Sequence, residues 1–382
     1  MKILVNSARL LVGLLFIFSG LVKAIDPLGL SYKMQEFFEA WAAAGYLKGL
    51  LTALTNYALP FAIIMIALEV ILGLALLIGW QKKISTWLLL LLTLFFTFLT
   101  SYVLFSGKIR ACGCFGDCIP LTPLQTFSKD LVLLLLILVI MGGRKYIQPL
   151  FSTMVNVGLI TLMTILIFGL QWYVLNHLPL VDCLPFKKGS DLLEGRKMPK
   201  DAVPDKYDYV FVYEKAGQQK EFKLATGLPD STWKFADRKQ ILIEKGKNNT
   251  PLINDFMMKT ANDNDTTEAI LSQPGEYYLL FMKEVPVLKD PLTSWRADID
   301  FILKANAKGK PVFVITAQTK ATATRFNISI EGKALPIPIF TADATAIKTA
   351  ARADIVLYQM NGPLVVNKWA AADIARVAKG WK

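Results

Sequence analysis

The first 180 residues alternate between long apolar stretches and short polar connections. A helix needs about 20 mostly apolar residues to cross the hydrocarbon core of a bilayer. Because lipid-exposed backbone must satisfy its hydrogen bonds within the segment, such stretches form helices. We therefore predict five transmembrane helices in a lipid bilayer, at Ile3–Val22, Tyr57–Gly79, Ser85–Phe105, Phe127–Gly142 and Val155–Leu175.

The segment Tyr32–Leu51, between the first two predicted spans, is amphipathic rather than uniformly apolar. Its aromatic residues Phe37, Phe38 and Trp41 are interspersed with acidic residues. This pattern predicts a helix that lies in the membrane interface. Such a helix either anchors the protein or covers a lateral entrance for a lipid-soluble substrate.

The short basic loops predict the orientation. Lys82 and Lys83 follow the second predicted span, and Arg144 and Lys145 follow the fourth. With five alternating spans both loops lie on one side, which the positive-inside rule assigns to the cytoplasm. We expect a multi-pass protein of the bacterial inner (cytoplasmic) membrane, with its C-terminal region in the periplasm.

Beyond residue 180 the pattern becomes that of a water-soluble region. A connector rich in Pro, Gly and Lys, Val181–Lys200, precedes three alternating segments that predict strands. From residue 276 strands and helices alternate, which is similar to a thioredoxin-like fold. The predicted strands are Tyr207–Glu214, Gln219–Ala225, Gln240–Glu244, Tyr277–Met282, Pro311–Thr316, Ile355–Tyr358 and Leu364–Lys368, and the predicted helices are Ser294–Ala307, Ala344–Arg352 and Ala370–Ala378.

The catalytic features of thioredoxins are missing from this C-terminal pattern. The stretch Glu284–Trp295, where the family carries Cys-x-x-Cys, contains no cysteine, and Asp354 stands where the family usually has a cis-proline. We therefore expect this part of the chain to dock a protein partner rather than to exchange disulfides itself.

Composition agrees with a chain divided in this way. Hydrophobic residues make up 54% and charged residues 19%, with a mean hydropathy of +0.42. The formal net charge of +12 is spread along the chain without a basic run. Because nucleic-acid binding requires a concentrated basic patch, we expect no nucleic-acid partner.

Two ionisable residues fall inside predicted spans, where a charge is costly and therefore informative. Arg9 lies near the cytoplasmic end of the first span, and Glu69 lies near the middle of the second. The rise of a helix places them at different depths that a long arginine side chain can bridge. They form either an interhelical ion pair or a site in which Glu69 binds a quinone or a proton.

The four cysteines are the candidate catalytic residues. The predicted topology puts Cys112, Cys114 and Cys118 in one outer loop, and it puts Cys183 after the fifth span on the same side. Thiols this close in an oxidising compartment exchange disulfides or bind metal. Three readings remain open: structural disulfides, exchange that passes electrons to a quinone in the bundle, and a four-thiolate metal site.

Three sequence segments carry a resemblance to a known family. Arg9–Lys23 and Glu69–Gly79 resemble the first two helices of the DoxX superfamily, and Cys112-Gly-Cys-Phe-Gly116 resembles the loop of its MauE branch, the methylamine-utilisation membrane proteins. A bundle of this type fused to an exterior domain is similar to proteins of Bacteroidetes. The resemblance implies a four-helix bundle and a role in maturing disulfide-rich periplasmic partners.

Together these patterns predict a membrane α-helical bundle followed by an α/β region. The expected divisions are a four-helix DoxX/MauE-like core (1–145), a fifth transmembrane helix (146–180), a connector and β-rich segment (181–275) and a thioredoxin-like domain without Cys-x-x-Cys (276–382). The expected function is that of an inner-membrane redox or maturation factor for periplasmic proteins, with a quinone as candidate electron acceptor. The alternative is a non-enzymatic scaffold that anchors a partner-binding domain.

Overall fold

The computed structural model describes residues 1–109, 113, 115–215, 217–223, 227–244, 246–283, 301–302, 304–305, 308–317, 328–330, 333–335 and 338–380. Within these ranges, five helices are long and apolar enough to cross a membrane. They are α1 (Lys2–Ala24), α4 (Ala58–Ile78), α5 (Lys82–Ser106), α6 (Pro123–Gly142) and α7 (Thr153–Asn176). All five predicted spans are therefore confirmed, and the fourth begins four residues earlier than expected.

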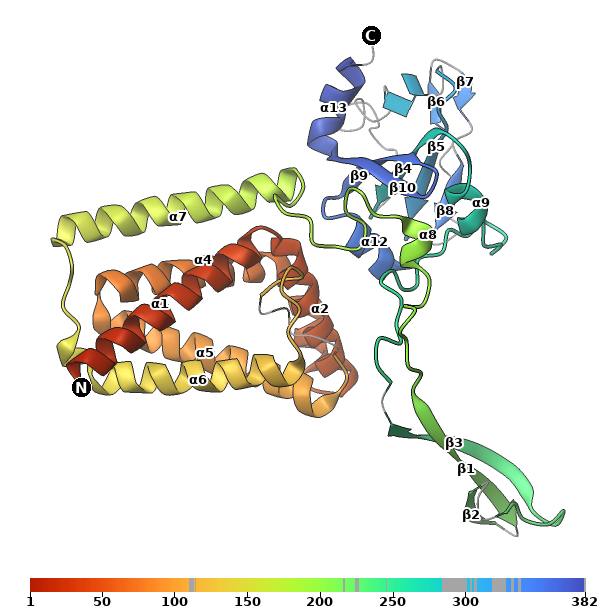
Figure 1. The fold of residues 1–382 in the computed structure, drawn as a ribbon, viewed down its shortest axis with the longest axis horizontal. Helices are drawn as coiled ribbons and strands as arrows, with labels where there is room; N and C mark the ends of the chain where they lie inside the picture. Colours follow the sequence, from red (N-terminus) through yellow and green to blue (C-terminus); the bar gives the residue numbers. More distant parts are fainter. Residues whose placement is uncertain are drawn as a thin grey trace.

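Helices α1, α4, α5 and α6 form one bundle, and α7 packs along α4 with most of its surface exposed (Figure 1). The closest approach is between α1 and α4. There, a Cβ atom added to Gly73 would lie 2.9 Å from the carbonyl oxygen of Gly13. Small residues let transmembrane backbones approach in this way, and the resulting van der Waals contact drives helix association in lipid.

We expect Gly73→Ala to destabilise the bundle by about 1–3 kcal/mol, because the new methyl group would force α1 away from α4. Gly158→Ala is the matched control, since Gly158 lies in α7 and has open space around it. Thermal unfolding of both variants in detergent tests this expectation. Equal melting temperatures for the two would contradict a close contact at Gly73.

The amphipathic segment forms α2 (Pro27–Ala43), followed by the short α3 (Lys48–Thr55). Asp26 caps α2 by accepting from the backbone N–H of Gly29, and Pro27 occupies its first turn. Helix α2 crosses the end of the bundle and buries Met34, Phe37 and Phe38 against it (Figure 1). An amphipathic helix at this place confirms the sequence pattern.

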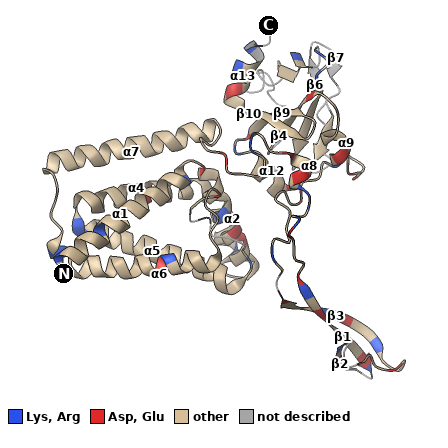
Figure 2. Cartoon of the chain, viewed as in Figure 1, with Lys and Arg blue, Asp and Glu red and all other residues tan. Residues whose placement is uncertain are grey.

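Charged side chains are sparse along the five spans and concentrate on α2 and on the C-terminal region, which begins after α7 (Figure 2). Its first sheet contains β1 (Lys206–Lys215), β2 (Gln218–Lys223) and β3 (Lys234–Glu244) in the order β2-β1-β3, all antiparallel. This confirms the three predicted strands. The sheet extends away from the rest of the molecule (Figure 1), and every residue of β3 is exposed.

A five-stranded mixed sheet forms the core of the C-terminal region, in the order β10-β9-β4-β5-β8. β4 is buried on both faces and pairs in parallel with β5 and antiparallel with β9. The elements are α8 (Leu192–Gly195), α9 (Thr267–Leu271), β4 (Glu276–Met282), β5 (Val312–Thr316), β6 (Ile328–Ile330), β7 (Lys333–Leu335), β8 (Ile339–Thr341), α12 (Ala344–Ala350), β9 (Ile355–Asn361), β10 (Leu364–Ala370) and α13 (Ala371–Gly380).

The structure confirms the predicted hairpin of β9 and β10 and the helices α12 and α13. Strand β8 was not predicted, because its three residues are too few for an alternating pattern to be visible. The predicted helix Ser294–Ala307 lies largely outside the described residues. The C-terminal region is therefore a mixed α/β structure that follows the five spans.

Candidate functional site

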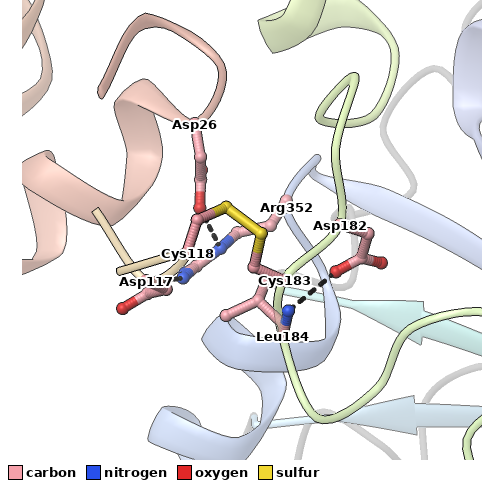
Figure 3. The surroundings of a disulfide bond; sticks show 7 residues. All are labelled: Asp26, Asp117, Cys118, Asp182, Cys183, Leu184 and Arg352. Carbon is pink, nitrogen blue, oxygen red and sulfur yellow. Dashed lines mark hydrogen bonds and ion pairs between the residues drawn. A yellow bond between two sulfur atoms is a disulfide. The ribbon is translucent and has the colours of Figure 1, made fainter. Parts of the chain in front are cut away.

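Cys118 and Cys183 form a disulfide bond (Figure 3). Cys118 lies in the loop between α5 and α6, and Cys183 lies in the connector after α7, 65 residues further along the chain. The bond therefore joins the helical bundle to the C-terminal region. Cys112 and Cys114, the other two cysteines that we singled out, lie outside the described residues.

Each bonded cysteine directly follows an aspartate, and each aspartate accepts from a cation of the C-terminal region. Nη2 of Arg352 donates to Asp117 Oδ2 over 2.7 Å, and Lys368 Nζ donates to Asp182 Oδ2 over 2.6 Å. Both cationic side chains are buried. The two ion pairs hold the chain on either side of the disulfide in place (Figure 3 shows the Arg352 contacts).

Arg352 also links the C-terminal region to the start of α2. Its Nε atom lies 2.8 Å from Asp26 Oδ2, so one guanidinium bridges two carboxylates of the membrane part (Figure 3). Burial raises the pKa of Asp26, and the positive charge of Arg352 partly offsets this. Since burying an unpaired charge is costly, the bridge fixes the loop that carries Cys118 against α12.

A cleft of ≈ 520 Å³ opens beside the disulfide, between α2 and the C-terminal region. Cys183 is one of the residues that line it. Three cations approach the ring of Tyr32 on one side of the cleft: Lys348 and Arg352 at 5.3 Å, and Lys283 at 5.6 Å. Burial lowers the pKa of Lys283 to about 8. The further lining residues include Gly29, Lys33, Glu36, Glu39, Asp117, Pro120, Leu184, Pro185 and Leu252.

The predicted pairing of Arg9 with Glu69 is wrong. Arg9 donates to the carbonyl oxygens of Leu76, Leu77 and Gln148. The cause is the antiparallel packing of α1 on α4, which puts Arg9 beside the last turn of α4. Carbonyl groups there have no partner within the helix, and a cation is favourable at that end of the dipole.

Glu69 pairs instead with Lys23, whose Nζ atom lies 2.6 and 2.8 Å from its two carboxylate oxygens. Ser19 donates to the same carboxylate over 2.9 Å. All three side chains are buried. We missed Lys23 because the predicted span ended one residue before it. Its signal is the seven-residue spacing of Arg9, Phe16 and Lys23, which places them on one face of α1.

A second ion pair lies in α6, where Lys129 Nζ is 2.5 Å from Asp130 Oδ1. The helix begins at Pro123 with a capping box formed by Thr122 and Gln125, so that Asp130 lies two turns inside it. Asp130 is buried and accepts from the hydroxyl of Thr100 over 3.0 Å.

His177, the single histidine of the chain, contacts α13. Its Nδ1 atom lies 2.9 Å from Asp373 Oδ2, and its ring stacks on Tyr173. Among the described residues no group of three or more metal-ligating side chains occurs. A four-thiolate metal site would need all four cysteines as thiolates, and the disulfide occupies two of them.

Comparisons with known proteins match two parts of the chain. Residues 1–143 match the family model described as methylamine utilisation protein MauE. Residues 207–245, which contain β1, β2 and β3, match a family described as a domain of unknown function (DUF8463). Neither a curated protein nor a solved structure matches the chain.

Proposed function

We propose that this protein, whose residues 1–143 match the MauE family model, is a membrane-embedded thiol–disulfide exchange or maturation factor for protein partners. The proposed location is the inner membrane of a bacterium, with the C-terminal region in the periplasm. The observation that carries the proposal is the Cys118–Cys183 bond, which joins the bundle to the C-terminal region beside an open cleft.

In this proposal Cys183 is the cysteine that the partner attacks, because it is the bonded cysteine that lines the cleft. A thiolate of the partner attacks Sγ of Cys183, the Cys118–Cys183 bond breaks, and Cys118 leaves as a thiolate. A second partner thiolate then attacks the mixed disulfide and releases Cys183. The partner gains a disulfide, and this protein keeps two thiols that hold the two electrons.

The charges around the disulfide support this direction. The Cys118 thiolate forms beside Asp117, whose negative charge would disfavour it. Since Arg352 pairs with Asp117, that repulsion is reduced. The cleft combines cations and carboxylates with the apolar side chains of Pro120, Leu184 and Pro185. Such a lining suits an extended polypeptide better than a small uniform ligand.

Reoxidation requires an electron acceptor, and a quinone in the bundle is the proposed one. An apolar groove of ≈ 250 Å³ lies between α4 and α5, and its lining residues Leu68 and Leu72 flank Glu69 in α4. The groove suits the apolar part of a quinone. Cys112 and Cys114 are the proposed carriers of electrons from Cys118 and Cys183 toward it.

The C-terminal region has no cysteine after Cys183, so its proposed role is to dock the partner. The strand order β10-β9-β4-β5-β8 supports a thioredoxin-like arrangement for residues 276–382. In this proposal the region supplies Arg352 and Lys368, which position the disulfide, and one wall of the cleft.

The test is to trap the mixed disulfide. Cys118→Ser leaves Cys183 as a free thiol, which can run the exchange step in reverse: its thiolate attacks the disulfide of the oxidised partner, and one partner sulfur leaves as a thiolate. Because Cys118 is then missing and cannot resolve this mixed disulfide, we expect a covalent adduct between Cys183 and the partner protein that disappears on reduction. Cys118→Ser with Cys183→Ser is the matched control and should give none. If the four cysteines keep one redox state during growth, and every serine variant behaves as the wild type does, the exchange proposal is wrong.

The alternative scaffold function is favoured by one separate observation, the sheet of β1, β2 and β3. The side chains of Tyr207, Phe235 and Leu242 are exposed on this sheet. Large apolar side chains that are exposed in this way favour association with another protein. Removing residues 207–245 tests this function. A scaffold would lose partner capture in this deletion variant, while its cysteine-to-serine variants would remain active. An exchange factor would keep partner capture in the deletion variant and lose activity in the serine variants.

A further inference from the structure

A cavity of ≈ 20 Å³ lies inside the bundle where α1, α4, α5 and α6 meet. Its polar lining combines the ion pairs Lys23–Glu69 and Lys129–Asp130 with the hydroxyl groups of Ser19 and Thr93. The cleft beside the Cys118–Cys183 bond shares no lining residue with this cavity.

The cavity is large enough for one water molecule, which requires about 10–15 Å³. A water is stable inside a protein only where several polar groups can bind it. The lining provides the carboxylates of Glu69 and Asp130, the ammonium groups of Lys23 and Lys129, and the hydroxyl of Thr93. The cavity is too small for a quinone ring or for any larger ligand.

Thr93 gives independent evidence for a bound molecule. Its side chain is 1% exposed, and its Oγ1 atom has no hydrogen-bond partner among the described residues. Other threonines of α5, such as Thr86 and Thr97, donate to the carbonyl oxygen one turn earlier. Thr93 does not, and a buried hydroxyl without a partner costs about 1–3 kcal/mol. A water in the cavity it lines supplies the missing partner.

The cavity connects a pair near the surface with a pair in the interior. Lys129 is 22% exposed, and its Nζ atom lies 5.1 Å from the ring centroid of Phe115. Phe115 belongs to the cysteine loop and packs on Phe18 of α1. The Lys23–Glu69 pair, by contrast, is almost fully buried. The route from Asp130 to Glu69 therefore runs from beneath the cysteine loop into the bundle.

We propose that this cavity is a proton-transfer site, in which one bound water passes protons between Asp130 and Glu69. The Asp130 carboxylate first takes up a proton from the outer solution. That proton then passes to the water as the water gives one of its own to the Glu69 carboxylate. The water is thus unchanged by each transfer. The titratable groups that face it are Lys23 on α1, Glu69 on α4 and both Lys129 and Asp130 on α6, and α5 contributes only Thr93 and Phe96.

The role of the site rests on the proposed function. A partner dithiol loses two electrons and two protons when it becomes a disulfide. A quinone takes up two electrons and two protons when it becomes a quinol. The electrons pass through the cysteines, and the protons reach the quinone through Asp130, the water and Glu69. The partner dithiol releases two protons to the outer solution at the cleft, and these replace the two protons that Asp130 takes up from it.

Thr93→Val tests the site, because it removes the hydroxyl and keeps the shape of the side chain. We expect the full chain in liposomes to reduce decylubiquinone with dithiothreitol at least about tenfold more slowly in this variant, with a larger solvent isotope effect. Thr93→Ser should restore the rate. Thr97→Val is the matched control, since the Thr97 hydroxyl bonds only within its helix.

A second measurement does not depend on quinone reduction. Infrared spectra report the carboxylate stretching band that Glu69→Gln removes, and its frequency depends on the hydrogen bonds that the carboxylate accepts. We expect this band to lie at a different frequency in Thr93→Val than in wild type and in Thr97→Val, because the bound water is lost. Equal frequencies would overturn the water site. A wild type that reduces no quinone but shows a shifted band in Thr93→Val would contradict the quinone step and leave the water site standing.

Discussion

Lys23→Met is expected to destabilise the helical bundle by about 3–5 kcal/mol. The substitution keeps most of the side-chain length but leaves the Glu69 carboxylate as an unpaired charge that is 1% exposed. Ser19 is then its remaining hydrogen-bond donor among the interactions described. Because a single cavity water does not replace the ammonium group, Glu69 must take up a proton or the contact between α1 and α4 must open. Chemical unfolding in detergent micelles measures the loss.

The matched variants separate the charge effect from packing. Lys23→Met combined with Glu69→Leu removes both charges and should recover most of the stability, since apolar replacement of a buried ion pair is often neutral. Lys33→Met should cost much less, because its partner Glu36 is 42% exposed. If the double variant is as unstable as Lys23→Met alone, the loss comes from packing and not from the unpaired charge.

The long-range pattern of the chain was predictable from the sequence. The five spans, the amphipathic segment and the hairpins each depend on a repeat that extends over many residues, and all of them are confirmed. Burial of apolar side chains determines where these helices and strands form, so the hydropathy pattern alone is enough to locate them along the chain. The boundaries were less accurate. The start of α6 depends on the capping box of Thr122, which an apolar count does not detect.

The pairing of charges was not predictable in the same way. Depth along a helix suggested Arg9 as the partner of Glu69, but depth ignores which faces of α1 and α4 meet. The faces are set by the contact of Gly13 with Gly73, which brings Lys23 to Glu69 and Arg9 to the end of α4. The sequence did contain one indication that Lys23 faces α4, because its spacing from Arg9 places both residues on the same face of α1.

The choice of disulfide was open because any two of four cysteines can pair. The bond between Cys118 and Cys183 depends on contacts between residues far apart in the chain, above all Asp117 with Arg352 and Asp182 with Lys368. The repeated Asp-Cys sequence marks both cysteines. Its meaning became visible only when the fold placed a buried cation beside each aspartate.

Cys183→Ser is expected to weaken the attachment of the C-terminal region to the bundle. The bond closes 65 residues, and for such a loop the chain-entropy model gives about 4 kcal/mol, an upper value because α6 and α7 already restrain that loop. The Arg352 and Lys368 ion pairs remain, so we expect partial release rather than separation. Trypsin should then cleave the connector at Lys187 and Lys188 faster than in wild type.

Cys118→Ser should match Cys183→Ser closely, because either substitution breaks the same bond. Adding Arg352→Gln to Cys183→Ser should accelerate cleavage further, since Asp26 and Asp117 then lose their shared cation. Lys197→Gln is the control for charge changes, because its pair with Glu194 is exposed and lies within the C-terminal region. Cleavage that is unchanged in both cysteine variants would mean that the ion pairs alone hold the C-terminal region, and that the disulfide is free to open during exchange without moving it.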